Sequence, residues 1–123
     1  MLASSNDSAI SCNLFAKELL NRVGDKWSIL IVGYLAGGPM RFNELRRAIG
    51  LVSQRMLTLT LKNLEKDGLV KRTAFPTVPP RVDYELTPLG KTFREPIKAL
   101  VDWAIEHQPD VNQARIAYGL NNS

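Results

Sequence analysis

The sequence predicts an α+β fold that is mainly helical, and three observations lead to this class. A helix over residues 54–67 is bounded by the capping residue Ser53 and by Gly68, which can adopt a positive φ just past a helix end. A short helix and a tight turn precede this helix, and two runs of strand-like composition follow it. This order of elements is that of a winged helix-turn-helix.

Length and composition indicate one domain over residues 1–123. The chain has 123 residues, 45% of them hydrophobic, which is enough for a single core. Its longest mostly apolar run, Trp27 to Ala36, is about half the length of a membrane-spanning helix, and its start lacks the order of a signal peptide. We therefore expect a soluble, cytoplasmic protein with no membrane partner.

Cysteine and histidine are too rare for a metal site built by one chain. Cys12 is the single cysteine and His107 the single histidine, so an internal disulfide and a Cys/His zinc site are excluded. We expect no metal and no cofactor.

Two helices are predicted before the central region. Ser11 is expected to cap the first helix, which Gly24 ends. Asp25 is expected to cap the second, and the Gly37–Pro39 run stops it. Apolar residues cover most of the second helix, which indicates a central, buried position.

A brief strand over residues 40–42 and a short helix over residues 43–49 follow, and Gly50 turns the chain. Beyond the capped helix, residues 69–75 and 82–86 form the two strands of a hairpin, or wing. The loop that joins them contains Pro76, Pro79 and Pro80. We expect a stiff tip that loses little conformational entropy on binding and that projects toward phosphate or the minor groove.

Thr87 and Pro88 predict the start of a last helix, which Pro96 is expected to bend. The tail at residues 108–123 is polar and is expected to fray. The predicted organisation is therefore a DNA-binding core at about 25–87 between terminal helices at about 1–24 and 88–107. Both terminal helices have more apolar surface than a small core needs, which favours their use as dimerisation helices. A monomer in which both cover the second helix is the alternative.

The basic charge of the chain is concentrated in its middle third. Residues 41–81 contain nine Lys and Arg against three Asp and Glu, whereas the flanking segments are neutral or acidic. This distribution suggests a polyanion facing that third, although a solvated basic face would have the same composition.

The capped helix has a face suited to reading bases. Helical spacing places Leu57, Leu61 and Leu64 on one buried stripe and polar residues opposite. Arginine can bond guanine, glutamine can bond adenine, and threonine offers a hydroxyl and a methyl group. Leu59 falls on the exposed side, where it either touches a thymine methyl or packs against the wing or a neighbouring helix. The predicted DNA-binding residues are Arg41, Arg46, Ser53, Gln54, Arg55, Thr58, Leu59, Lys62, Lys71, Arg72 and Arg81.

The run "GDKWSILIVGYLAGGPMRFNELRRAIGLVSQRMLTLTLKNLEKDGLVKR" followed by "PPRVDYELTPLG" closely resembles the HxlR family of bacterial winged-helix regulators, relatives of the MarR group. The resemblance extends from about Cys12 to Trp103. It implies a dimeric, DNA-binding transcription regulator. A dimer would present two recognition helices about 34 Å apart to a pseudo-palindromic operator.

The resemblance also implies a regulatory role for Cys12, because some family members sense oxidants or electrophiles through a cysteine at this position. A helix N-terminus would lower the pKa of the thiol, whereas a buried cysteine would be inert. A small aromatic effector held by Phe15, Trp27, Tyr34 and Trp103 is a second hypothesis, and aromatic residues that simply pack the core are its alternative.

Two other classes of function compete with DNA binding. A winged-helix module that binds protein would use the apolar helices for its partner and leave the basic segment without a role. An enzyme is not indicated, since the sequence lacks a glycine-rich phosphate loop and His107 has no nucleophile motif around it.

Overall fold

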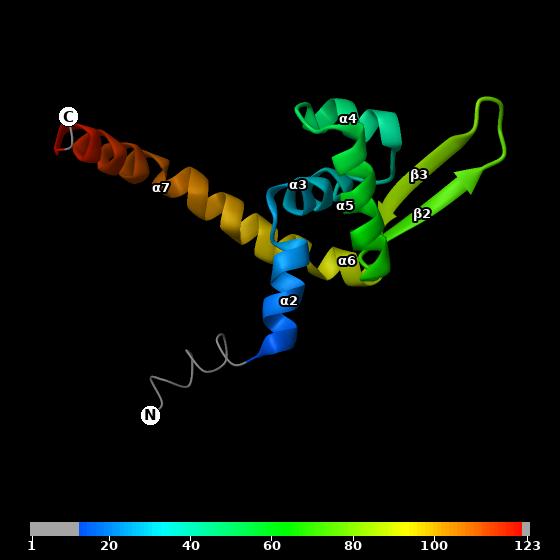
Figure 1. Ribbon diagram of the computed structural model, residues 1–123, viewed down its shortest axis with the longest axis horizontal. Coiled ribbons are helices and arrows are strands. Elements are labelled where there is room, and N and C mark those ends of the chain that lie inside the picture. The colour runs from blue at the N-terminus through cyan, green and yellow to red at the C-terminus, as the bar shows by residue number, and fades with distance from the viewer. Residues whose placement is uncertain (1–12, 122–123) are drawn as a thin grey trace.

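A computed structural model of the protein describes residues 13–121 and confirms the mainly helical α+β class, with a winged helix-turn-helix at its centre (Figure 1). The elements in chain order are α2 (Leu14–Val23), α3 (Lys26–Leu35), β1 (Met40–Arg41), α4 (Phe42–Ile49), α5 (Gln54–Lys66), β2 (Val70–Phe75), β3 (Arg81–Leu86), α6 (Pro88–Thr92) and α7 (Arg94–Asn121).

Side-chain caps start these helices close to where the sequence predicts them. Ser53 Oγ accepts a hydrogen bond from the backbone N–H of Met56 at 3.0 Å, and Gly68 just past α5 has φ 78°. Asp25 accepts from the N–H of Ser28 at the start of α3. The cap of α2 is Asn13, whereas the predicted cap Ser11 lies outside the described residues.

The strands form one small antiparallel sheet in the order β1-β3-β2. The hairpin pairs Val70 with Leu86 at its base and Phe75 with Arg81 near its tip. The brief strand predicted at residues 40–42 is β1, which pairs with β3. The two-stranded wing is therefore tied to the residues just before α4.

The core lies where α5 packs on α3. Leu57, Leu61 and Leu64 are at most 1% exposed, so they form the buried stripe that their spacing predicts. Ile31 and Val32 of α3 are fully buried, which confirms the central position of that helix. The wing and α4 complete the enclosure of these side chains.

The last predicted helix is divided, contrary to expectation. Thr87 caps α6 by accepting from the N–H of Gly90, but α6 ends at Thr92 and α7 begins at Arg94. In a continuous helix the ring of Pro96 would collide with the carbonyl of Thr92, four residues earlier. The break before Pro96 removes this collision. Pro96 then lies in the first turn of α7, where its missing N–H is not needed.

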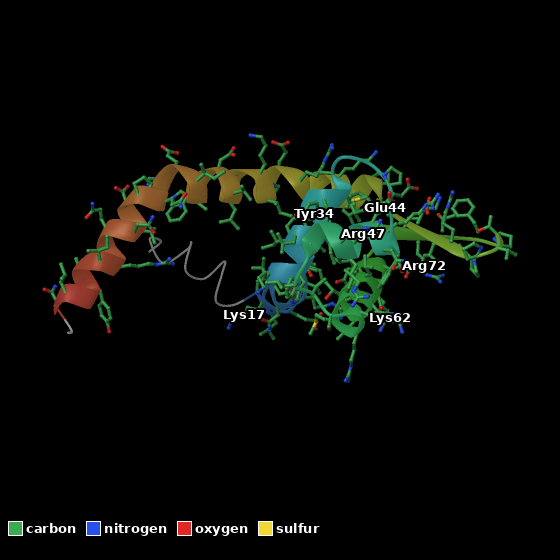
Figure 2. The ribbon with its side chains drawn as sticks, turned by 90° about the horizontal axis from the view of Figure 1, so that it is seen from above. Lys17, Tyr34, Glu44, Arg47, Lys62 and Arg72 are labelled. Atoms are coloured by element: carbon green, nitrogen blue, oxygen red, sulfur yellow. The ribbon has the colours of Figure 1, made fainter. Side chains whose placement is uncertain are left out.

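The prediction of a fraying tail is wrong for the part that the structure describes. α7 continues through Pro109 to Asn121, because the residues beyond Pro109 include good helix formers and a bend can relieve the clash of the proline ring with the carbonyl of Ile105. Figures 1 and 2 show α7 extending away from the rest of the molecule, and Figure 2 shows it changing direction in its orange part. Within residues 13–121, no helix has the apolar length that a bilayer crossing requires.

Gly90 in α6 and Gly33 in α3 offer a matched test of how closely α6 packs against the backbone of Leu69. A Cβ on buried Gly90 would lie 2.0 Å from the carbonyl oxygen of Leu69, whereas a Cβ on Gly33 in α3 would meet no atom within 4 Å. We expect Gly90→Ala to lower the free energy of unfolding by about 1 to 3 kcal/mol or more. Gly33→Ala should raise it by about 0.5 to 1 kcal/mol. Urea denaturation measures both, and equal effects would contradict the close approach of α6 to the backbone of Leu69, just before β2.

Candidate nucleic-acid interface

The buried leucine stripe of α5 turns the opposite side of this helix to solvent. Gln54, Arg55, Thr58 and Lys62 are all exposed on it. Leu59 is 49% exposed, so neither the wing nor a neighbouring helix of the same chain buries it. The structure therefore brings the predicted base-reading residues together on one surface, with an apolar side chain beside them.

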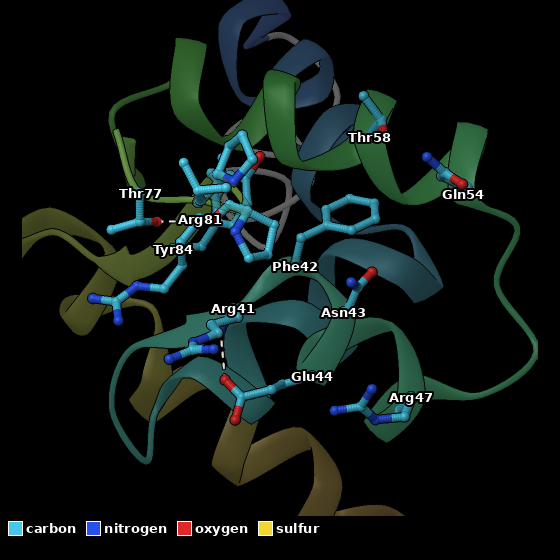
Figure 3. A pocket seen from close by; sticks show the side chains of 14 residues that line it. Arg41, Phe42, Asn43, Glu44, Arg47, Gln54, Thr58, Thr77, Arg81 and Tyr84 are labelled. Atoms are coloured by element: carbon cyan, nitrogen blue, oxygen red, sulfur yellow. Dashed lines mark hydrogen bonds between the residues drawn. The ribbon is translucent and has the colours of Figure 1, made fainter. Parts of the chain in front are cut away.

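A groove separates this surface from the wing, and Figure 3 shows it from close by. Its volume is about 810 Å³. Phe42 and Tyr84 line it with ring centroids 6.5 Å apart, and Gln54 and Thr58 reach it from α5. The other lining residues are Arg41, Asn43, Glu44, Arg47, Thr77, Val78, Pro79, Pro80, Arg81 and Val82.

The short helix α4 supplies the cations on one side of the groove. Arg41 lies just before α4, and its backbone N–H donates to Glu44 Oε1 at 2.8 Å. Arg47 lines the groove, although sequence reasoning missed it as a site residue. Arg47 lies four residues after Asn43, another lining residue, so helical spacing alone predicts that the two side chains share one face of α4. Arg46 instead borders a shallower hollow with Arg47 and Gly50.

The wing places two cations of the predicted DNA-binding set, Lys71 and Arg72, on opposite sides. Lys71 is paired in register with Glu85, and Arg72 with Tyr84. Because neighbouring residues of a strand face opposite sides, these two cations cannot follow the same stretch of phosphate. Arg72 shares its side with Tyr84, which lines the groove, whereas Lys71 lies on the outer side opposite an acidic residue.

Arg81 is more constrained than its predicted role requires. Its Nε lies 3.2 Å from Asp83 Oδ1, and its guanidinium carbon lies 4.3 Å from the centroid of the Phe75 ring. Both atoms of the ion pair are buried without a well-aligned hydrogen bond. Arg81 thus braces the wing, and Asp83 offsets part of its charge.

The tip beyond Arg81 is uncharged over residues 76–80. Val78 is 99% exposed at its end, and the hydroxyl of Thr77 donates to the carbonyl of Pro79 at 2.8 Å. The predicted projecting loop is present, but its outermost surface is apolar rather than cationic.

The four residues of the predicted effector pocket differ in their exposure, and the pocket itself stays a prediction. Phe15, Tyr34 and Trp103 are exposed, because α2 and α7 diverge from the core instead of closing over α3 (Figure 1). Only Trp27 packs partly against the core, with the ammonium of Lys26 4.4 Å from its ring centroid. The core alternative therefore holds for Trp27 alone. Cys12 lies outside the described residues.

A capped recognition helix on a short preceding helix, a two-stranded wing and a cationic groove between them define a DNA-binding protein of the winged helix-turn-helix class. The comparison with protein families agrees with this class. The chain belongs to the HxlR-like helix-turn-helix family, whose model matches residues 22–112.

Individual relatives cover most of the chain. The HTH-type transcriptional regulator YtfH of Escherichia coli (strain K12) is 45% identical over 108 residues, which span 84% of this chain and 86% of YtfH. The solved structure of ytfH from Salmonella typhimurium is 42% identical, covers 84% of this chain and 96% of its own, and has a TM-score of 0.78. The reduced form of the redox regulator HypR is 35% identical over 80% of this chain and 97% of its own, with a TM-score of 0.74. The protein is an HTH-type transcriptional regulator and not an enzyme.

Adjacent cations on opposite sides of β2 give a direct test of the groove's orientation. We expect Arg72→Ala to reduce the slope of log affinity for duplex DNA against log salt by about 0.9, the value for one phosphate contact. Lys71→Ala, which removes the same charge from the outer side, should leave the slope nearly unchanged. Fluorescence anisotropy over a salt series measures both slopes, and an equal reduction in both variants would contradict this orientation.

Proposed function

We propose that the protein is a homodimeric, sequence-specific regulator that binds a pseudo-palindromic operator, with α5 in the major groove and the wing against the flanking backbone. The observation that carries this proposal is the surface of α5. Its leucine stripe is buried, so Gln54, Arg55 and Thr58 point outward beside a groove that contains arginines. Each recognition helix would then enter one half-site.

The side chains on this surface differ in their expected roles. Arg55 can bond guanine through two N–H groups, Gln54 can bond adenine, and Thr58 and Leu59 can contact a thymine methyl. Lys62, Arg41 and Arg46 supply point charges for phosphates. Ser53 Oγ already accepts from the N–H of Met56, which leaves its hydroxyl hydrogen free to donate to a phosphate.

Exposed apolar side chains on α2 and α7 support the dimer. Figure 1 shows both helices extending from the body of the molecule. Only Val23 of α2 and Ile97 of α7 are buried. A monomer in which both helices cover α3 would bury more, so a second copy is the simplest cover for the remainder. The exposed apolar residues of these helices include Leu14, Phe15, Leu20, Leu100, Val101, Trp103 and Ile105.

Thiol sensing through Cys12 is the proposed regulation. The support is similarity to a redox regulator: HypR in its oxidised form is 37% identical over 74% of this chain. With a single cysteine per chain, oxidation would give a disulfide between two subunits, a mixed disulfide with a small thiol, or a sulfenic acid, whereas an electrophile would give an alkylated thiol.

The base-reading role of Arg55 can be tested once bound fragments have been selected from genomic DNA. We expect Arg55→Ala to weaken operator binding by about 1 to 3 kcal/mol and to relax the preference at one base position per half-site. Lys62→Ala, the matched control, should weaken binding to all sequences similarly. Competition binding against single-base operator variants measures the preference, and an unaltered preference in Arg55→Ala would refute its role.

The thiol hypothesis has a separate test. Wild-type protein should release operator DNA after treatment with diamide or a quinone, and reductant should restore binding after diamide. Cys12→Ser should bind equally well before treatment and stay bound after it. Electrophoretic mobility shift measures the bound fraction. Release of the serine variant to the same extent would rule out Cys12 as the sensor.

A further inference from the structure

An ion pair joins α2 to the far end of the recognition helix. Arg22 Nε donates to Asp67 Oδ2 at 2.9 Å, across 45 residues of sequence. Arg22 lies in the last turn of α2, and Asp67 is the residue that ends α5. Their side chains are 35% and 19% exposed, so the contact is partly protected from water.

The helix dipole and the backbone hydrogen bonds of α5 do not by themselves favour an aspartate at position 67. The C-terminal end of a helix has a partial negative charge, which makes an acidic side chain unfavourable there. The backbone N–H of Asp67 closes the last turn onto Asn63, a role that any residue other than proline could take. The guanidinium of Arg22 compensates the carboxylate, so the pair accounts for an acidic residue at this position.

The backbone of Arg22 is in turn held by α3. The hydroxyl of Ser28 donates to the carbonyl oxygen of Arg22 at 3.1 Å, and the side chain of Ser28 is fully buried. The N–H of Ser28 is capped by Asp25 between the two helices. Arg22 therefore reaches α5 from a fixed point at the junction of α2 and α3.

We infer that Arg22 and Asp67 are positioning residues that set the angle of the recognition helix relative to α2, the helix on which the proposed dimer packs. The inference rests on the proposed function. A helix of 13 residues is about 20 Å long, so a tilt of about 5° at Asp67 would move the side chains near Gln54 by about 1.7 Å. Base-edge hydrogen bonds do not tolerate such a shift, whereas long phosphate-binding side chains do.

The test is a double-mutant cycle on the full chain with Arg22→Ala, Asp67→Ala and both together. Each single variant should bind the selected operator about 3-fold to 10-fold more weakly than wild type. This range corresponds to the loss of one partly exposed ion pair in each of two subunits. Affinity for an unrelated duplex and the salt slope should not change, because neither residue faces the DNA. The double variant should be no weaker than the weaker single variant.

Lys98→Ala is the matched control, since it breaks the exposed Lys98–Asp102 pair, 2.8 Å long, on α7. It should bind as wild type does. Single variants with wild-type operator affinity, additive losses in the double variant, or equal losses on operator and unrelated duplex would each overturn the inference. If wild-type protein bound the operator and an unrelated duplex equally well, the proposed function itself would be overturned. The two binding curves of the wild-type protein distinguish this outcome from a failure of the inference.

Discussion

The packing of three leucines from α5 against α3 is the constraint on which the rest of the interface depends. Leu57, Leu61 and Leu64 bury one side of the recognition helix, and a helix has a fixed rotation per residue. Their burial alone therefore decides that Arg55 and Thr58 face outward. The apolar core and the polar surface are therefore two sides of one helix, and the rotation of the helix about its axis fixes both.

The alternation of side chains along the wing is a second constraint on which cations face the groove. Alternation along β2 places Arg72 on the side of Tyr84 and Lys71 on the outer side, so fewer cations share the side of the groove than the basic composition suggests. Arg81 is held by Asp83 and Phe75, and the tip beyond it ends in exposed Val78. In the proposed complex, shape and apolar contact would therefore matter at the tip, while charge would act closer to α4 and α5.

Local patterns in the sequence were sufficient for the class of fold, the caps at Ser53 and Asp25, and the buried stripe of α5, since each depends on residues a few positions apart. Two of the features that sequence reasoning missed depend on contacts that form only when the chain folds. Arg81 meets Phe75 only through the strand register, and Arg22 meets Asp67 only once three helices have packed. The division of the last helix follows from a local clash at Pro96. Composition alone does not give the residue at which the helix breaks.

The proposed function requires that the exposed side of α5 contacts base edges of the operator. The most direct test attaches an azidophenacyl group to a cysteine introduced at position 58, in a chain whose single natural cysteine is replaced by Cys12→Ser. We expect the Thr58→Cys protein to form photo-crosslinks to bases inside the operator, whereas Ala99→Cys on α7 should not. Crosslinks from position 99 without any from position 58 would contradict it.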